Sequence, residues 1–291
     1  MGKKELIIFK NGFGISDSDF MKENFKPLVL YFFSAYLISW IIWLPLYLPK
    51  FGIHFLPVLP YHHAWGALGP LSAAFILNKI EYGNSGVKSL LSRMFQWKVH
   101  WFWYFIAVFS PFVLLGFATS MNYFINSKFS FDGLGRSLEF PQFGIVTFFL
   151  YNVIVYGFGE ETGWRGYALP KLQKKWNALQ STLVLTILWA LWHAPLFLYR
   201  PSFMAMDLFG IFGWFMSLFT GAILLTWLYN SSRGSILMVA LFHGTIDIVF
   251  TSDSIDTNIM NITGFLLVVF AVIVLGLTGW KHLSKVNRQI S

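Results

Sequence analysis

The chain has 291 residues, of which 56% are hydrophobic, 20% aromatic and only 12% charged. Soluble domains carry about 25% charged residues, so the composition excludes an ordinary soluble protein and indicates an integral membrane protein. The formal net charge of +8 arises from lysines and arginines between apolar runs, and we interpret it as an orientation signal with no nucleic-acid-binding footprint. Because the chain has no cysteine, disulfides, thiolate ligands and palmitoylation are excluded.

Eight apolar stretches follow one another along the chain. Five uncharged runs are long enough to span a membrane, which takes about 20 residues of helix, and they cover 28–48, 101–125, 140–159, 208–230 and 257–280. Two further runs, 61–78 and 179–199, contain histidine as their only ionisable residue type, and an eighth, 234–252, contains His243 and Asp247. We therefore expect an all-α, polytopic membrane helix bundle with about eight transmembrane helices and short interfacial helices.

The charges between the apolar runs predict the orientation. Alternate segments carry seventeen lysines and arginines on one side and four on the other, and short cytoplasmic loops retain the positive charge. Both termini are therefore expected in the cytoplasm. We divide the chain into a cytoplasmic segment 1–27, a single transmembrane domain 28–280 and a cytoplasmic tail 281–291. The protein would be a multi-pass membrane protein, located in the plasma membrane if the host is a bacterium.

Two segments outside the runs have apolar residues at helical spacing. The stretch 85–98 alternates leucine, methionine and phenylalanine with lysine, serine and glutamine, which predicts a helix lying on the cytoplasmic surface. The stretch 167–176 contains three lysines and follows a predicted break at Pro170, so it predicts a second interfacial helix.

Three ionisable clusters lie inside or beside the apolar runs. Glu160, Glu161 and Arg165 form the first, His193 stands alone, and His243 with Asp247 forms the third. A charge near the bilayer centre costs a few kcal/mol, so such residues indicate function. Glu161 and Arg165 are four apart and share a helix face, which leaves Glu160 free to face a cavity. His243 and Asp247 share a face for the same reason.

The three clusters can form one site only if their side chains lie at similar depths in the membrane. At 1.5 Å per residue, His193 lies about 21 Å along its run and His243 about 14 Å. Glu160 reaches them only if its helix continues past Arg165. We therefore predict that the fourth span covers about 146–169 and stops at Pro170, with Glu160 about 10–15 Å deep in a water-accessible cavity that opens to the cytoplasm.

A buried carboxylate, two imidazoles and another oxygen suit two chemistries. Desolvation makes a glutamate a better general base, so Glu160 and a histidine would activate water while other donors steady an oxyanion. The same side chains, Glu160, His193, His243 and Asp247, would also suit a zinc ion. The residues leave the cofactor open between none and zinc.

Three motifs carry a family resemblance. Glu160-Glu161-x-x-x-Arg165, Trp189-x-x-x-His193 and His243-x-x-x-Asp247 resemble the motifs of the CAAX protease and bacteriocin-processing family (CPBP, or Abi), over about residues 60–255. This family includes the type II CAAX prenyl endopeptidases. Trp189 replaces the usual phenylalanine, and Asp247 replaces the usual asparagine. As a carboxylate, Asp247 accepts hydrogen bonds but does not donate them unless protonated.

The resemblance implies an intramembrane endopeptidase, glutamate-dependent or metal-dependent. Glu160 and His193 would activate the attacking water, His243 and Asp247 would occupy the oxyanion-stabilising positions, and Glu161 and Arg165 would support them. The substrate would be a peptide or membrane-associated protein tail that enters from the membrane or cytoplasmic side, in contact with membrane lipid.

Two other functions compete with the enzyme. A non-catalytic membrane scaffold or bacteriocin-immunity protein would keep the family fold and bind a partner. A small-solute or proton transporter would use the polar residues as a relay, although we find neither internal repeats nor paired discontinuous helices. The sequence leaves open the substrate and its prenylation, the role of Asp247, the oligomeric state and the host.

Overall fold

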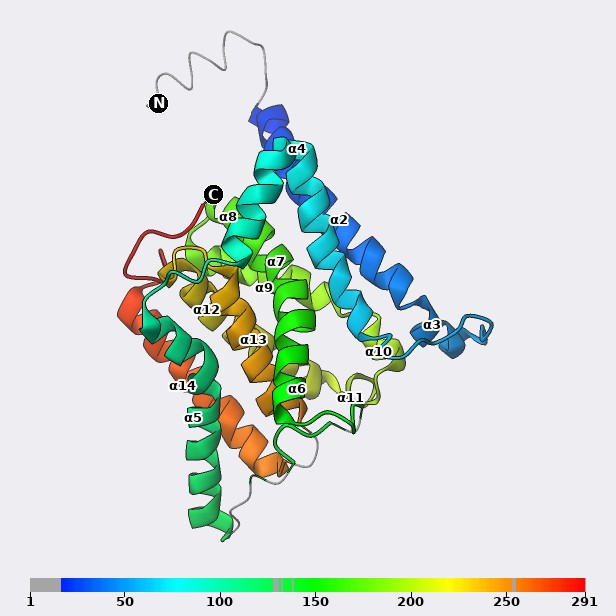
Figure 1. Ribbon diagram of the computed structural model, residues 1–291, viewed down its shortest axis with the longest axis vertical. Coiled ribbons are helices and arrows are strands. Elements are labelled where there is room, and N and C mark those ends of the chain that lie inside the picture. Colours follow the sequence, from blue (N-terminus) through cyan, green and yellow to red (C-terminus); the bar gives the residue numbers. More distant parts are fainter. Residues whose placement is uncertain (1–16, 128–130, 132, 138, 253–254, 291) are drawn as a thin grey trace.

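The computed structural model describes residues 17–127, 131, 133–137, 139–252 and 255–290, with side chains from residue 25 onward. Within these residues the secondary structure is helical and no strand occurs, so the predicted all-α class is confirmed. The helices cross the molecule alternately from one end to the other (Figure 1). Residues 1–16 of the predicted cytoplasmic segment lie outside the described part of the chain.

Among the residues that the structure describes, five helical stretches are long and apolar enough to cross a membrane. They are Phe25–Ile42 within α2 (Asp17–Ile42), α5 (Trp101–Asn126), Ala178–Tyr199, α12 (Leu208–Ser231) and α14 (Thr257–Thr278). The stretch Ala178–Tyr199 comprises α9 (Ala178–Trp192) and α10 (Leu196–Tyr199). Large apolar side chains such as Phe117 on α5 and Leu277 on α14 are exposed, as is expected of helices that face lipid. The total of eight spans stays a prediction.

Short helical turns connect several of the longer helices. These turns are α3 (Leu44–Tyr47), η1 (Leu48–Phe51), η2 (Ala64–Ala67) and α11 (Pro201–Met204).

Helix α4 (Leu68–Met94) has two legs joined at Gly83, whose φ of 61° is in the left-handed region that favours glycine. The first leg corresponds to the predicted second span and the other to the predicted interfacial helix 85–98. The second leg turns back along the molecule (Figure 1) and buries Leu90. It is therefore a packed leg of α4 rather than a separate element.

The fourth predicted span is a composite helix. It runs without interruption through α6 (Ile145–Tyr151), η3 (Asn152–Phe158), α7 (Gly159–Gly163), η4 (Trp164–Ala168) and α8 (Leu169–Gln173). The prediction that this helix continues past Arg165 is confirmed. As a result, Glu160 lies near the middle of the composite helix.

The predicted stop at Pro170 is wrong. Pro170 lies in the first turn of α8, and the helix continues to Gln173. The segment η4 directly before it is π-helical. Because proline has no N–H, a backbone carbonyl of the preceding turn loses its partner, and local π-helical adjustments of this kind satisfy such carbonyls. Tyr167, Leu169 and Leu172 are buried, so 167–176 is not the predicted interfacial helix.

Hydrogen bonds join the lysine-rich segments at one end of the bundle. Gln173 bonds to Asn230 and to the carbonyl of Gln289, and Gln96 donates to the carbonyl of Ser232. The segments that the charge count placed on one side of the membrane are thus neighbours. Assignment of this end to the cytoplasm stays a prediction.

Glycines bring the composite helix against α13 (Ile236–Thr251). A Cβ atom on Gly157 would lie 2.5 Å from the backbone oxygen of Ala240, and one on Gly244 would lie 2.7 Å from the backbone nitrogen of Val153. Both positions therefore exclude larger residues, as is usual where membrane helices approach closely. This contact places His243 beside the acidic turn of α7.

Candidate active site

The acidic pair lies on a single α-helical turn between two π-helical segments. Glu160 and Glu161 belong to α7, with η3 before it and η4 after it. π-helical segments inside longer helices are frequent at functional sites, because the extra residue in the turn re-aims nearby side chains. Here the two carboxylates bind different partners.

Glu161 is the centre of a buried ionic network. Its Oε1 atom accepts hydrogen bonds from Arg165 at 2.8 Å and from Nδ1 of His243 at 2.7 Å. The side chains of Glu161 and Arg165 are completely buried. The predicted pairing of these two residues is therefore present, while the bond from Glu161 to His243 was not predicted.

Glu160 is held by two tryptophans. Its Oε2 atom accepts the indole N–H of Trp189 at 2.8 Å and that of Trp164 at 3.3 Å. Glu160 is 5% exposed. In the described part of the chain its other oxygen, Oε1, accepts no hydrogen bond, so Oε1 is the atom available to a reacting water.

Trp189 connects Glu160 to both histidines. Its ring centre lies 5.9 Å from that of His193 and 5.8 Å from that of His243, and the Arg165 guanidinium lies over its face at 4.7 Å. The structure thus brings the three motifs together. The motif pattern alone predicts Trp189 only as an aromatic substitute for phenylalanine. The signal that could have predicted its bond to Glu160 is the indole N–H, a hydrogen-bond donor that phenylalanine lacks.

His193 caps the end of α9 with a fixed ring orientation. Its Nδ1 atom lies 2.8 Å from the carbonyl oxygen of Trp189. A carbonyl only accepts hydrogen bonds, so Nδ1 carries the proton and Nε2 of the neutral ring has a free lone pair. Phe203 and Trp214 flank the ring, so the base stands in an aromatic pocket.

His243 lies between two carboxylates. Its Nε2 atom is 3.6 Å from Oδ2 of Asp247, and its Nδ1 atom is bound by Glu161. The predicted shared face of His243 and Asp247 is therefore present. Asp247 is half-buried beside this ring.

A zinc ion needs three or more ligands that converge on one point. Within the described residues, no three His, Asp or Glu side chains form such a group. Glu160 instead accepts two indole donors, and His243 is bound by Glu161. The donor set as arranged does not fit a metal.

Comparison with known proteins agrees with the three motifs. Residues 142–249 match the family model described as type II CAAX prenyl endopeptidase Rce1-like, and this segment contains all three motifs. Over 262 residues the chain is 29% identical to CAAX prenyl protease 2 of Methanococcus maripaludis, covering 84% of this chain and 92% of that protein. The family model covers a shorter segment than the 60–255 expected.

The apolar helices and these matches define a multi-pass integral membrane protein. Within that class, the chain resembles the type II CAAX prenyl endopeptidases, as the motifs predicted. Both matches are to proteases, which supports a protease here as well.

Proposed function

We propose that this protein is an intramembrane endopeptidase that hydrolyses a peptide bond near the C-terminus of a membrane-anchored, lipid-modified tail. The observation that carries the proposal is the position of Glu160 in the middle of the composite helix, fixed through Oε2, with Oε1 free and both histidines across Trp189. The name of the Methanococcus maripaludis relative supports a prenylated tail as the substrate class.

Glu160 and His193 would act together on water. Oε1 of Glu160 and Nε2 of His193 are the two acceptors that remain available once Oε2 and Nδ1 are bound. One of them removes a proton while the water oxygen bonds to the carbonyl carbon of the scissile peptide. The same proton is then delivered to the leaving nitrogen as the C–N bond breaks.

His243 would stabilise the oxyanion that forms on the carbonyl oxygen. Glu161 fixes its ring through Nδ1, which leaves Nε2 as the nitrogen that would contact the oxyanion. Asp247 lies next to that nitrogen. We assign Asp247 a positioning role, because a carboxylate beside an imidazole orients the ring and favours its protonated form.

No step of this mechanism uses a metal, because the donor set does not fit one. Elemental analysis of the purified, active protein tests this directly. We expect well below one zinc per chain and unchanged cleavage after treatment with a chelator. Stoichiometric zinc that is lost together with activity would contradict the assignment.

The substrate class is tested in membranes. We would compare the C-termini of membrane proteins in cells that express the wild-type protein with those in cells that express Glu160→Gln. The proposal predicts shortened C-termini that appear only with the wild type. An identical set of C-termini, together with a phenotype that Glu160→Gln preserves, would favour the scaffold or immunity function instead.

A further inference from the structure

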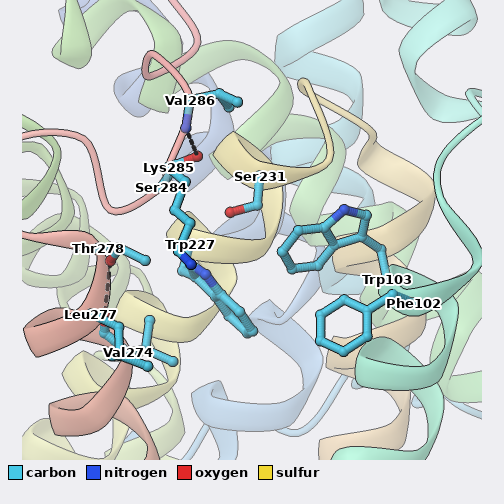
Figure 2. Close-up of a pocket in the computed structure, with 10 residues that line it drawn as sticks. All are labelled: Phe102, Trp103, Trp227, Ser231, Val274, Leu277, Thr278, Ser284, Lys285 and Val286. Carbon is cyan, nitrogen blue, oxygen red and sulfur yellow. Dashed lines mark hydrogen bonds between the residues drawn. The ribbon is translucent and has the colours of Figure 1, made fainter.

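A cavity lies outside the three motifs. It has a volume of about 350 Å³ and lies between α5, α12, α14 and the C-terminal tail (Figure 2). Its lining residues are Phe102, Trp103, Trp227, Ser231, Val274, Leu277, Thr278, Ser284, Lys285 and Val286. None of these belongs to the motifs of the candidate active site, so the cavity needs an explanation of its own.

The cavity has an apolar part and a polar part. Trp103 and Trp227 meet edge to face with ring centres 5.4 Å apart, and aliphatic side chains of α14 continue this apolar wall (Figure 2). Ser231 and the tail residues Ser284 and Lys285 form the part at the end of the bundle. Such a gradient matches the boundary between acyl chains and headgroups in a bilayer.

Hydrogen bonds hold the polar wall of the cavity in place. The tail is bound to the ends of α9 and α12. The backbone N–H of Ala178 donates to the carbonyl of Lys281, and the Asn230 side chain donates to the carbonyl of His282. Leu283 is completely buried with a φ of 42°, a strained conformation for leucine that persists only when its surroundings fix it. Lys285 is therefore presented on an anchored loop.

The positive charge of Lys285 at this wall indicates an anionic ligand. Lys285 is exposed and forms no ion pair among the described residues, and its side chain extends into the cavity in Figure 2. Basic pockets between membrane helices on the cytoplasmic side bind anionic lipid headgroups, and the charge count predicts that this end is cytoplasmic. We propose that the cavity binds an anionic glycerophospholipid, with an acyl chain beside Trp103 and Trp227 and the phosphate at Lys285.

Native mass spectrometry of the full-length protein from nanodiscs tests the site. The probe is a mixture of phosphatidylcholine and phosphatidylglycerol. For the wild type we expect one phosphatidylglycerol retained in preference to phosphatidylcholine. Lys285→Gln should reduce that preference about fivefold, the effect of one lysine at a lipid headgroup. Lys88→Gln removes an exposed lysine of α4 that does not line the cavity, and it should leave the preference unchanged.

A second variant tests whether the open volume of the cavity is needed for lipid retention, without altering charge. Ser231→Leu adds apolar bulk to the cavity wall and should lower the retention of both lipids. Equal losses in Lys285→Gln and Lys88→Gln would overturn the proposal, since they would indicate only bulk attraction to a basic surface. Unchanged retention in Ser231→Leu would overturn it as well. Because none of these readouts uses cleavage, the result does not depend on the proposed peptidase activity.

Discussion

Trp189 donates its indole N–H to Glu160 and places its ring between Arg165, His193 and His243. The same position in the motif usually holds phenylalanine, which fills the space but has no donor. In this protein the tryptophan therefore adds a specific restraint on the carboxylate. A general base works best when its orientation is fixed before the substrate arrives.

Replacing Trp189 by phenylalanine tests this restraint. Trp189→Phe keeps an aromatic ring but removes the donor to a carboxylate, a hydrogen bond of about 1.5–3 kcal/mol. We expect kcat to fall about tenfold to hundredfold with KM unchanged, measured on a fluorogenic tail peptide. Trp192→Phe is the matched control, because the Trp192 indole donates to Ser39 instead. Equal losses in both variants would show a merely structural role.

Asp247 gives a second prediction at the residue scale. Asp247→Asn keeps the shape of the side chain and introduces an N–H donor beside His243. We expect the variant to retain activity, whereas Asp247→Leu should lose at least tenfold in kcat/KM. If Asp247→Asn were as inactive as Glu160→Gln, Asp247 would need a negative charge in the reaction itself, and the positioning role would be wrong.

Residue spacing predicted part of this network. The separations of four residues anticipated that Glu161 meets Arg165 and that His243 faces Asp247. The bond between Glu161 and His243 joins two distant segments and depends on how two helices pack, which spacing within one helix does not encode. The indole bonds to Glu160 depend on tertiary packing in the same way.

At the element scale, the composite helix from α6 to α8 is the main departure from hydropathy. The apolar run ends at 159, but the helix continues to Gln173. Hydropathy places the span too early because Glu160, Glu161 and Arg165 are satisfied inside the protein and do not face lipid. The need for Glu160 to reach both histidines predicted the continuation past Arg165. The break expected at Pro170 does not occur, because a π-helical turn precedes this proline.

The contact between η3 and α13 depends on glycine. Gly244→Ala would place a Cβ atom 2.7 Å from the backbone of Val153, and backbone at this distance has to move. We expect a loss of stability of about 1–3 kcal/mol, seen as a lower unfolding midpoint in detergent, together with reduced cleavage as His243 shifts. Gly264→Ala on α14 meets open space and serves as the control. Equal unfolding midpoints in the two variants would contradict this packing argument.

At the scale of the whole molecule, the structure explains how ionisable side chains are stabilised inside an apolar helix bundle. The six ionisable side chains of the three motifs lie within an apolar bundle, yet each has a partner: Glu160 has two indoles, Glu161 has Arg165 and His243, and His193 has a carbonyl. Asp247 lies 3.6 Å from Nε2 of His243. Composition predicted the membrane class and the helical fold, and alternation of charge predicted which segments gather at one end. Five of the eight expected spans meet the length and apolarity needed to cross a membrane.

The central claim is that Glu160 activates water for peptide hydrolysis. Its most direct test is cleavage of a farnesylated C-terminal peptide by purified protein in nanodiscs, with the wild type and Glu160→Gln compared at equal folded concentration. The glutamine variant keeps an oxygen that accepts the Trp189 donor but lacks a base. We predict cleavage by the wild type and a loss of at least a thousandfold in kcat for Glu160→Gln, with an unchanged unfolding midpoint. Cleavage by Glu160→Gln at the wild-type rate would contradict the account.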